Sequence, residues 1–273
     1  MKVNIFTTMT DPEKRRDPWR EALNCYQDFA DEVTVVGQDW PYEFNFKIIG
    51  QYFQEGFDKS NCDWAFRMDI DYFLHEKNFK NIYKQLDKYS SFPAIVFPQY
   101  QFFTSDRYQI KTKLAIALNK KKFPQIKFNG GGDLCLPTLE NKLLDIKKLP
   151  NLDIPIFQYD SMFRTKEIIS EDRARFARGW KRTFGDYGDR GGPTPEEAFE
   201  SWFNMIEEKY KFHTHKININ NHPKYIKNRL LNLSPEMFGH TAFELQTKSK
   251  RPMVNYIKGY KEKYLNNRLR LIN

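Results

Sequence analysis

Two aspartates separated by one residue, Asp69 and Asp71, are the side chains of this sequence with the clearest chemical potential. They follow Trp64-Ala65-Phe66, where apolar and other residues alternate as in a β-strand. Because a strand has a period of two, we expect both carboxylates to leave one face and converge on one cation. Mg²⁺ and Mn²⁺ prefer oxygen ligands and commonly share them with phosphate oxygens. The pair therefore predicts a site for a divalent metal and a diphosphate.

The spacing of the pair is weak evidence without its position. A chain with 18 aspartates among 273 residues contains about one such pair by chance. This pair, however, ends a strand that follows a βαβ unit, and ligands of open α/β sheets bind beyond the carboxyl ends of the strands. The alternative is a solvated turn in which Arg67 pairs with one of the aspartates.

The elements that must position this pair alternate between strands and helices. Strands are expected at 3–7, 32–37, 64–70 and 94–97, and helices at 18–29, 46–57 and 79–89. A strand, a helix and a strand at this spacing form a βαβ unit, which implies a parallel sheet. We therefore expect an α/β fold with a mostly parallel sheet flanked by helices.

The pattern is looser in the rest of the chain. Residues 100–108 continue the fourth strand or pair beside it, and 182–195 form a long loop rich in glycine and proline. Helices are expected at 114–119, 162–180, 195–210, 223–231 and 254–269. The second half of the chain is therefore predicted to be a mainly helical extension.

The composition is that of a globular chain, with 40% hydrophobic and 29% charged residues. A net charge of +9 attracts anions, although a basic surface also simply aids solubility. The three cysteines are widely spaced, which argues against a structural zinc site and fits a reducing compartment. We find no hydrophobic signal core and no stretch long enough to span a bilayer, so we expect a soluble, cytoplasmic protein.

The segment 62–72, Cys-Asp-Trp-Ala-Phe-Arg-Met-Asp-Ile-Asp-Tyr, resembles the "DW-hydrophobic-x-x-D-x-D" strand of family 2 glycosyltransferases with the GT-A fold. Residues 32–36 are similar to the second strand of that family, which leads into an acidic loop that contacts the nucleotide. The resemblance covers the first half of the chain. The sequence departs from the family where Gln38-Asp39-Trp40 replaces the usual Asp-Gly-Ser triplet.

The resemblance implies a GT-A core that binds a nucleotide sugar in residues 1–160. Residues 161–273 then form a mobile basic loop and a mainly helical region packed on the core. Asp71 would ligate the metal directly, and Asp69 would reach the ribose or a metal-bound water.

The remaining donor contacts lie near the ends of the first three strands. Thr7 would lie near the base or ribose, and Asp39 would accept a hydrogen bond from the base. Arg67 is also placed among the donor-binding residues. Thr7 and Asp39 have side chains that commonly cap loops as well, so a structural role explains them equally well.

An inverting transferase needs a carboxylate that takes the proton from the acceptor hydroxyl. Asp133 is the first candidate for this base, because the three glycines before it let the backbone approach a ligand closely. A carboxylate that caps the following turn is the alternative. Asp160 is the second candidate.

Basic side chains must stabilise the departing nucleoside diphosphate. Lys181, Arg182 and Arg190 lie in or beside the glycine-rich stretch, so this loop is expected to close over the donor; a solvated surface loop is the alternative. Some GT-A enzymes use a downstream histidine as a further metal ligand. His222 is the candidate for that position.

The sequence thus predicts a metal-dependent transfer, with Mn²⁺ or Mg²⁺, from a nucleotide-sugar donor to a glycan or lipid-linked sugar acceptor, with inversion. A nucleotidyltransferase is a second hypothesis, but residues 7–16 lack the glycines that it favours after the first strand. A nucleic-acid-binding protein would explain the basic charge and the 16% aromatic residues. It would not explain an acidic pair at a sheet edge, so we expect no nucleic acid as a partner.

Overall fold

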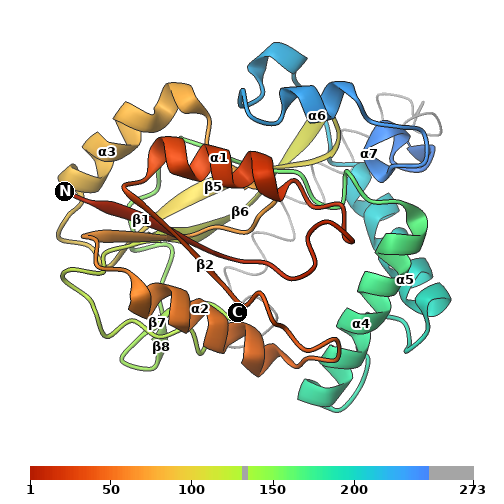
Figure 1. Ribbon diagram of the computed structural model, residues 1–273, viewed down its shortest axis with the longest axis horizontal. Helices are drawn as coiled ribbons and strands as arrows, with labels where there is room; N and C mark the ends of the chain where they lie inside the picture. Colours follow the sequence, from red (N-terminus) through yellow and green to blue (C-terminus); the bar gives the residue numbers. More distant parts are fainter. Residues whose placement is uncertain (131–134, 246–273) are drawn as a thin grey trace.

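The computed structural model describes residues 1–130 and 135–245 (Figure 1). The strands are β1 (Val3–Thr8), β2 (Glu32–Val36), β3 (Trp64–Arg67), β4 (Tyr72–Phe73), β5 (Ala94–Thr104), β6 (Arg107–Leu118), β7 (Thr138–Leu139), β8 (Lys142–Leu143), β9 (Ile156–Gln158) and β10 (His215–Lys216). The α-helices are α1 (Trp19–Phe29), α2 (Phe46–Lys59), α3 (Phe79–Lys88), α4 (Lys166–Phe184), α5 (Pro195–Tyr210), α6 (Lys227–Leu231) and α7 (Phe238–Thr241). Short 3₁₀ helices are η1 (Glu76–Asn78) and η2 (Ile219–Asn221).

The main sheet has the strand order β2-β1-β3-β6-β5-β9-β4, with β10 beside β6. Strands β1, β2 and β3 are parallel, β6 is antiparallel to both β3 and β5, and β9 is parallel to β5. Only β6 and β4 therefore run against the common direction of this path. The predicted α/β fold with a mostly parallel sheet flanked by helices is confirmed.

Helices cover both faces of the sheet (Figure 1). On one face α1, α3 and α6 bury apolar side chains such as Tyr26 and Ile82 against Val3, Phe66 and other strand residues. On the other face α2 buries Phe53 and its apolar neighbours against the sheet. The resulting three-layer arrangement leaves the carboxyl ends of β1, β2 and β3 at one shared edge.

Helices α4, α5 and α7 form a third group beside the sheet (Figure 1). Its core contains Ile169, Trp202 and Phe238, and Phe103 of β5 joins it to the sheet. Helix α4 ends at Gly185, whose φ of 91° is in the left-handed region that favours glycine. The helices predicted over 162–180 and 195–210 are found, the first shifted by four residues towards the C-terminus.

Three expectations for single elements are wrong or only partly met. Residues 114–119 do not form a helix, because Leu114 to Leu118 belong to β6, which pairs with β3 on one side and β5 on the other. Strand β3 ends three residues earlier than predicted. Within 223–231 only α6 is α-helical. The helix predicted at 254–269 lies outside the described residues.

None of the helices in the described ranges combines the length and the apolar character needed to cross a membrane.

Candidate functional site

The predicted acidic pair lies in a turn rather than on a strand. Because β3 ends at Arg67, Asp69, Ile70 and Asp71 connect it to β4, and the Tyr72 backbone N–H closes the turn by donating to the Asp69 carbonyl at 2.8 Å. The expectation that both carboxylates leave one face of a strand is therefore wrong. The turn nevertheless keeps the two side chains close enough for their charges to interact.

Helix α1 supports this turn from within the core. The hydroxyl of buried Tyr26 lies 2.6 Å from the carbonyl oxygen of Asp69 and 2.9 Å from that of Tyr72. Both ends of the turn are thereby tied to one side chain. A buried hydroxyl needs such partners, and the backbone of the turn supplies them.

Asp69 is paired within the protein. Both of its carboxylate oxygens accept hydrogen bonds from Nη2 of Arg67, at 2.9 and 3.1 Å. Arg67 is buried, and its guanidinium lies 4.1 Å from the centre of the Phe53 ring. This is the pairing that the alternative interpretation of the motif predicted, and it fixes Asp69 in place.

Asp71 is in the opposite situation. Burial, followed by the charges of Asp69 and Asp160, raises the pKa of Asp71 to about 8, and Arg164 opposes this only in part. Among the described residues no basic side chain forms an ion pair with Asp71. A cation beside this carboxylate would therefore be strongly favoured.

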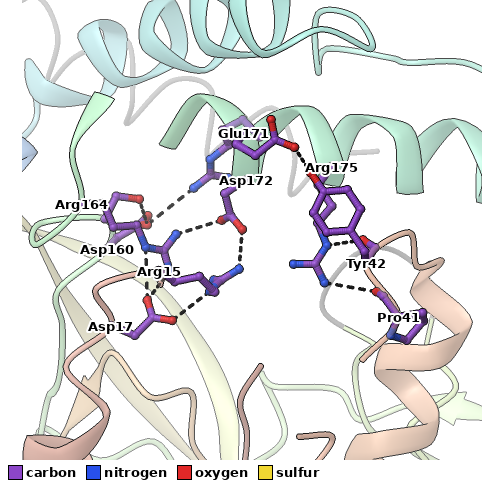
Figure 2. Close-up of polar contacts among 11 residues, drawn as sticks. Arg15, Asp17, Pro41, Tyr42, Asp160, Arg164, Glu171, Asp172 and Arg175 are labelled. Atoms are coloured by element: carbon purple, nitrogen blue, oxygen red, sulfur yellow. Dashed lines mark hydrogen bonds and ion pairs between the residues drawn. The ribbon is translucent and has the colours of Figure 1, made fainter. Parts of the chain in front are cut away.

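Figure 2 shows a closed ring of charges, two members of which, Arg164 and Asp17, interact electrostatically with Asp71. Arg164 donates to Asp17 at 2.5 Å and to Asp172 at 2.9 Å. Arg15 donates to Asp17 at 2.9 Å and also to Asp172. Two arginines and two aspartates thus join the segment after β1 to the start of α4.

The ring keeps Asp172 ionised although it is largely buried. Burial would raise the pKa of Asp172, but Arg15 and Arg164 outweigh it and lower that pKa to about 2. Asp17 is only 4% exposed. The ring is therefore a stabilising structure whose own charges cancel.

Asp160 follows β9 and lies beside the ring. Its carboxylate accepts hydrogen bonds from Gln101 and Ser161, each at 3.1 Å, and Nη2 of Arg173 lies 3.8 Å away. Burial alone would raise its pKa, but Arg173, Lys111 and Arg164 hold the pKa below its ordinary value. Asp160 is therefore ionised at neutral pH.

Two of the predicted donor contacts lie at the same edge of the sheet. Thr7, 1% exposed at the end of β1, has a buried hydroxyl without a hydrogen-bond partner among the described residues. Asp39 is exposed and accepts a hydrogen bond from the Tyr52 hydroxyl at 3.3 Å. Next to it the rings of Trp40 and Tyr52 are stacked at 5.6 Å.

Lys181 and Arg182 occupy the other end of α4 from the charge ring. Arg182 donates to the Phe44 carbonyl at 2.6 Å and pairs with Glu43 at 2.6 Å. Lys181 is exposed and lies 4.8 Å from the centre of the Tyr187 ring. Both side chains thus contact neighbouring segments and not the acidic turn.

His222 is separated from Asp71 by Tyr159, which contacts both residues. Tyr159 donates its backbone N–H to the Asp71 carbonyl, while its hydroxyl lies 2.8 Å from Nδ1 of His222. The other ring nitrogen lies 2.9 Å from the Ser105 carbonyl oxygen, and burial lowers the pKa of His222 to about 4. Both nitrogens are engaged, so we do not include His222 in the metal site proposed below. Asp133 lies outside the described residues.

Sequence reasoning missed the residues of the charge ring and the nearby Arg175. Arg175 donates to carbonyls of the loop after β2, opposite the ring (Figure 2). Asp17 and Arg164 are 147 positions apart in the chain. No local pattern marks a pair of that separation, so only the fold brings these residues together.

The chemistry of the acidic turn fits a hard cation only in part. Within 1–130 and 135–245, no three His, Cys, Asp or Glu side chains are grouped so as to hold a metal. The carboxylates of Asp69 and Asp71 are two oxygen donors of the preferred kind. Such a set binds Mg²⁺ or Mn²⁺ well only when a ligand and water supply the other oxygens.

Comparison with known proteins finds low similarity. No protein-family model and no curated protein matches the chain. The solved structure of S. aureus TarS 1-349 is 10% identical and covers 79% of this chain and 76% of its own, with a TM-score of 0.39. TarS 1-349 in complex with UDP-GlcNAc is 9% identical and covers 85% and 79%, also with a TM-score of 0.39. Because these scores are low, the site is interpreted from its own residues.

We expect Tyr26→Phe to destabilise the protein by about 1–2 kcal/mol, because the carbonyls of the acidic turn lose a buried donor. Urea unfolding measures this change. Tyr89→Phe is the control, since no hydrogen bond of its hydroxyl is found in the described structure. Equal stability of Tyr26→Phe and the wild type would show that this hydroxyl does not support the turn.

We expect Asp172→Asn to lower the free energy of unfolding by about 2 kcal/mol at pH 7. Because the native pKa of Asp172 is depressed, its contribution is present above about pH 4 and is lost as the pH falls towards 2. The stability curves of the variant and the wild type should therefore converge in acid. Exposed Asp87→Asn is the control, and a difference that stayed constant down to pH 2 would contradict the assignment.

Proposed function

We propose that this protein is a metal-dependent glycosyltransferase that moves a sugar from a nucleotide-sugar donor to a hydroxyl group of a glycan or lipid-linked acceptor. The observation that carries the proposal is the acidic turn at the carboxyl edge of the sheet, where Asp71 is crowded by two other carboxylates. A divalent cation relieves this crowding, and the cation in turn attracts a diphosphate. The ligand that best matches the turn is therefore a metal-bound nucleoside diphosphate sugar.

Asp71 and Asp69 would hold the metal, and phosphate oxygens and water would complete its coordination. The bound ion supplies charge neutralisation for the departing diphosphate. Arg67 positions Asp69 through the two hydrogen bonds described above. Its role towards the donor is then indirect.

The nucleoside would lie towards β1 and β2. Asp39 beside the stacked Trp40 and Tyr52 is available for the base. Aromatic faces of this kind favour planar rings. The Thr7 hydroxyl is unpaired but buried, so it would contact the ribose only if the end of β1 opened. Lys181 and Arg182 contact this site only if their segment moves, so their donor-binding role remains a prediction.

We assign the role of general base to Asp160, with Asp133 as the competing candidate. Asp160 is ionised, partly exposed and close enough to Asp71 for their charges to interact. It would take the proton of the acceptor hydroxyl while that oxygen bonds to the anomeric carbon. The bond from this carbon to the diphosphate oxygen breaks at the same time, which inverts the configuration.

Asp71→Asn separates the functional role from a structural one. The assay screens UDP-, GDP-, dTDP- and CMP-sugars with Mn²⁺. We expect one of them to raise the Tm of the wild type and to release its nucleotide. The variant should lose both responses. Without metal its Tm should instead rise by about 2–4 °C, because folding no longer has to protonate a carboxylate that is ionised in the unfolded chain.

Exposed Asp153→Asn is the matched control and should behave as the wild type does. Release of pyrophosphate from nucleoside triphosphates would indicate nucleotidyl transfer instead. Full activity of Asp71→Asn would rule out the metal role.

Asp160→Asn tests the base. We expect kcat to fall by about 10²–10⁴-fold, while the Tm shift caused by the donor and Mn²⁺ is retained, because a base acts on the acceptor and not on donor binding. Asp133→Asn is measured in parallel. If only Asp133→Asn loses turnover, the base is Asp133.

A further inference from the structure

Besides Arg164 of the charge ring, three basic side chains from three different elements interact electrostatically with Asp160. They are Lys111 of β6, Arg173 of α4 and Lys209 of α5. Arg173 lies 3.8 Å from Asp160, and its buried Nε has no hydrogen-bond acceptor among the described residues. One carboxylate thus faces three positive charges.

The sheet places Lys111 on the same face as Asp160. Gln109 donates to Gln101 at 2.7 Å, and Gln101 donates to Asp160 at 3.1 Å. Gln99 pairs with Lys111 and Gln101 with Gln109, without a bulge between these pairs. Since alternate residues of a strand share a face, Lys111 follows Gln109 along this polar row.

Helix α5 carries Lys209, the third of these cations. The guanidinium of Arg173 lies 5.3 Å from the centre of the Trp202 ring on α5, so α5 packs directly against the polar site. The Nζ atom of Lys209 lies 3.2 Å from Sδ of Met205. Burial and the charges of Lys111 and Arg173 lower the pKa of Lys209, as expected for cations held close together.

Neither lysine has a carboxylate partner of its own. Within 1–130 and 135–245, Lys111 and Lys209 form no salt bridge, and both are half-buried. The arginines of the charge ring differ, because each of them pairs with two aspartates. Half-buried cations without counter-charges favour binding of an anion.

We propose that Lys111, Arg173 and Lys209 form a binding site for a phosphate group of the acceptor, next to the hydroxyl that Asp160 deprotonates. The assignment to the acceptor rests on the proposed function, because the donor diphosphate is assigned to the acidic turn and not to these cations. Arg173 presents a planar fork that suits phosphate oxygens, and the two lysines add charge. The transferase would thus select acceptors that carry a phosphate near the reacting hydroxyl.

Inorganic phosphate is the probe for this site. Its binding is measured by calorimetry and thermal shift in EDTA, at constant ionic strength, so that the acidic turn takes no part. We expect Lys111→Gln and Lys209→Gln each to weaken binding about tenfold and the double variant to lose it. Lys209→Arg should retain binding, and so should Lys84→Gln, which removes an exposed lysine of α3.

A second arm separates the two sources of phosphate. With Mn²⁺ and saturating nucleoside diphosphate from the donor screen, phosphate should bind to the wild type as tightly as before. Displacement of phosphate by the nucleotide would overturn the acceptor assignment and show that the three cations belong to the donor-binding site. Unchanged phosphate binding by a folded double variant, or no binding by the wild type, would overturn the site itself. Phosphate binding without binding of any sugar nucleotide would overturn the proposed function and the acceptor assignment, but not the anion site.

Discussion

Carboxylates crowded at one edge of the sheet are the constraint on which the site depends. Each of them must be neutralised by a cation, hydrogen-bonded or protonated, because charge is costly where water is scarce. Asp69 is neutralised by Arg67, and Asp17 and Asp172 by Arg15 and Arg164. The fold thus supplies an arginine for each of these three aspartates. Asp71 is the exception, and its raised pKa is the consequence.

The charge ring has a second consequence for the architecture. Its four members come from the segment after β1, the turn after β9 and helix α4. Because an incomplete ring would leave a largely buried charge unpaired, these segments keep a fixed position relative to one another. Asp160 lies in the turn after β9, four residues before Arg164. The backbone hydrogen bond from Tyr159 to the Asp71 carbonyl then holds Asp160 beside the acidic turn.

The sequence predicted the parts of this fold that depend on local patterns. The βαβ unit and the two helices that follow it, α2 and α3, were found because apolar periodicity marks them. The acidic pair was expected on a strand and lies in the turn after β3. The apolar run 114–118 was predicted to be a helix, because periodicity cannot distinguish a buried strand from a short helix. In the structure this run is part of strand β6, which pairs with β3 on one side and β5 on the other. The charge ring and the polar row of β5 and β6 depend on contacts between distant segments, which no local pattern reveals.

Asp160 divides the site into two halves of opposite charge. Towards Asp71 the surroundings are acidic and favour a cation, whereas towards Lys111 and Lys209 they are basic and favour an anion. A ligand that carries a phosphate would be repelled from the first half unless a metal preceded it, but it enters the second half directly. Under the proposed function, metal and donor would occupy the acidic half together, and a phosphate-bearing acceptor would bind to the basic half independently of them. The acceptor hydroxyl would then lie next to Asp160, the one carboxylate that interacts with both halves.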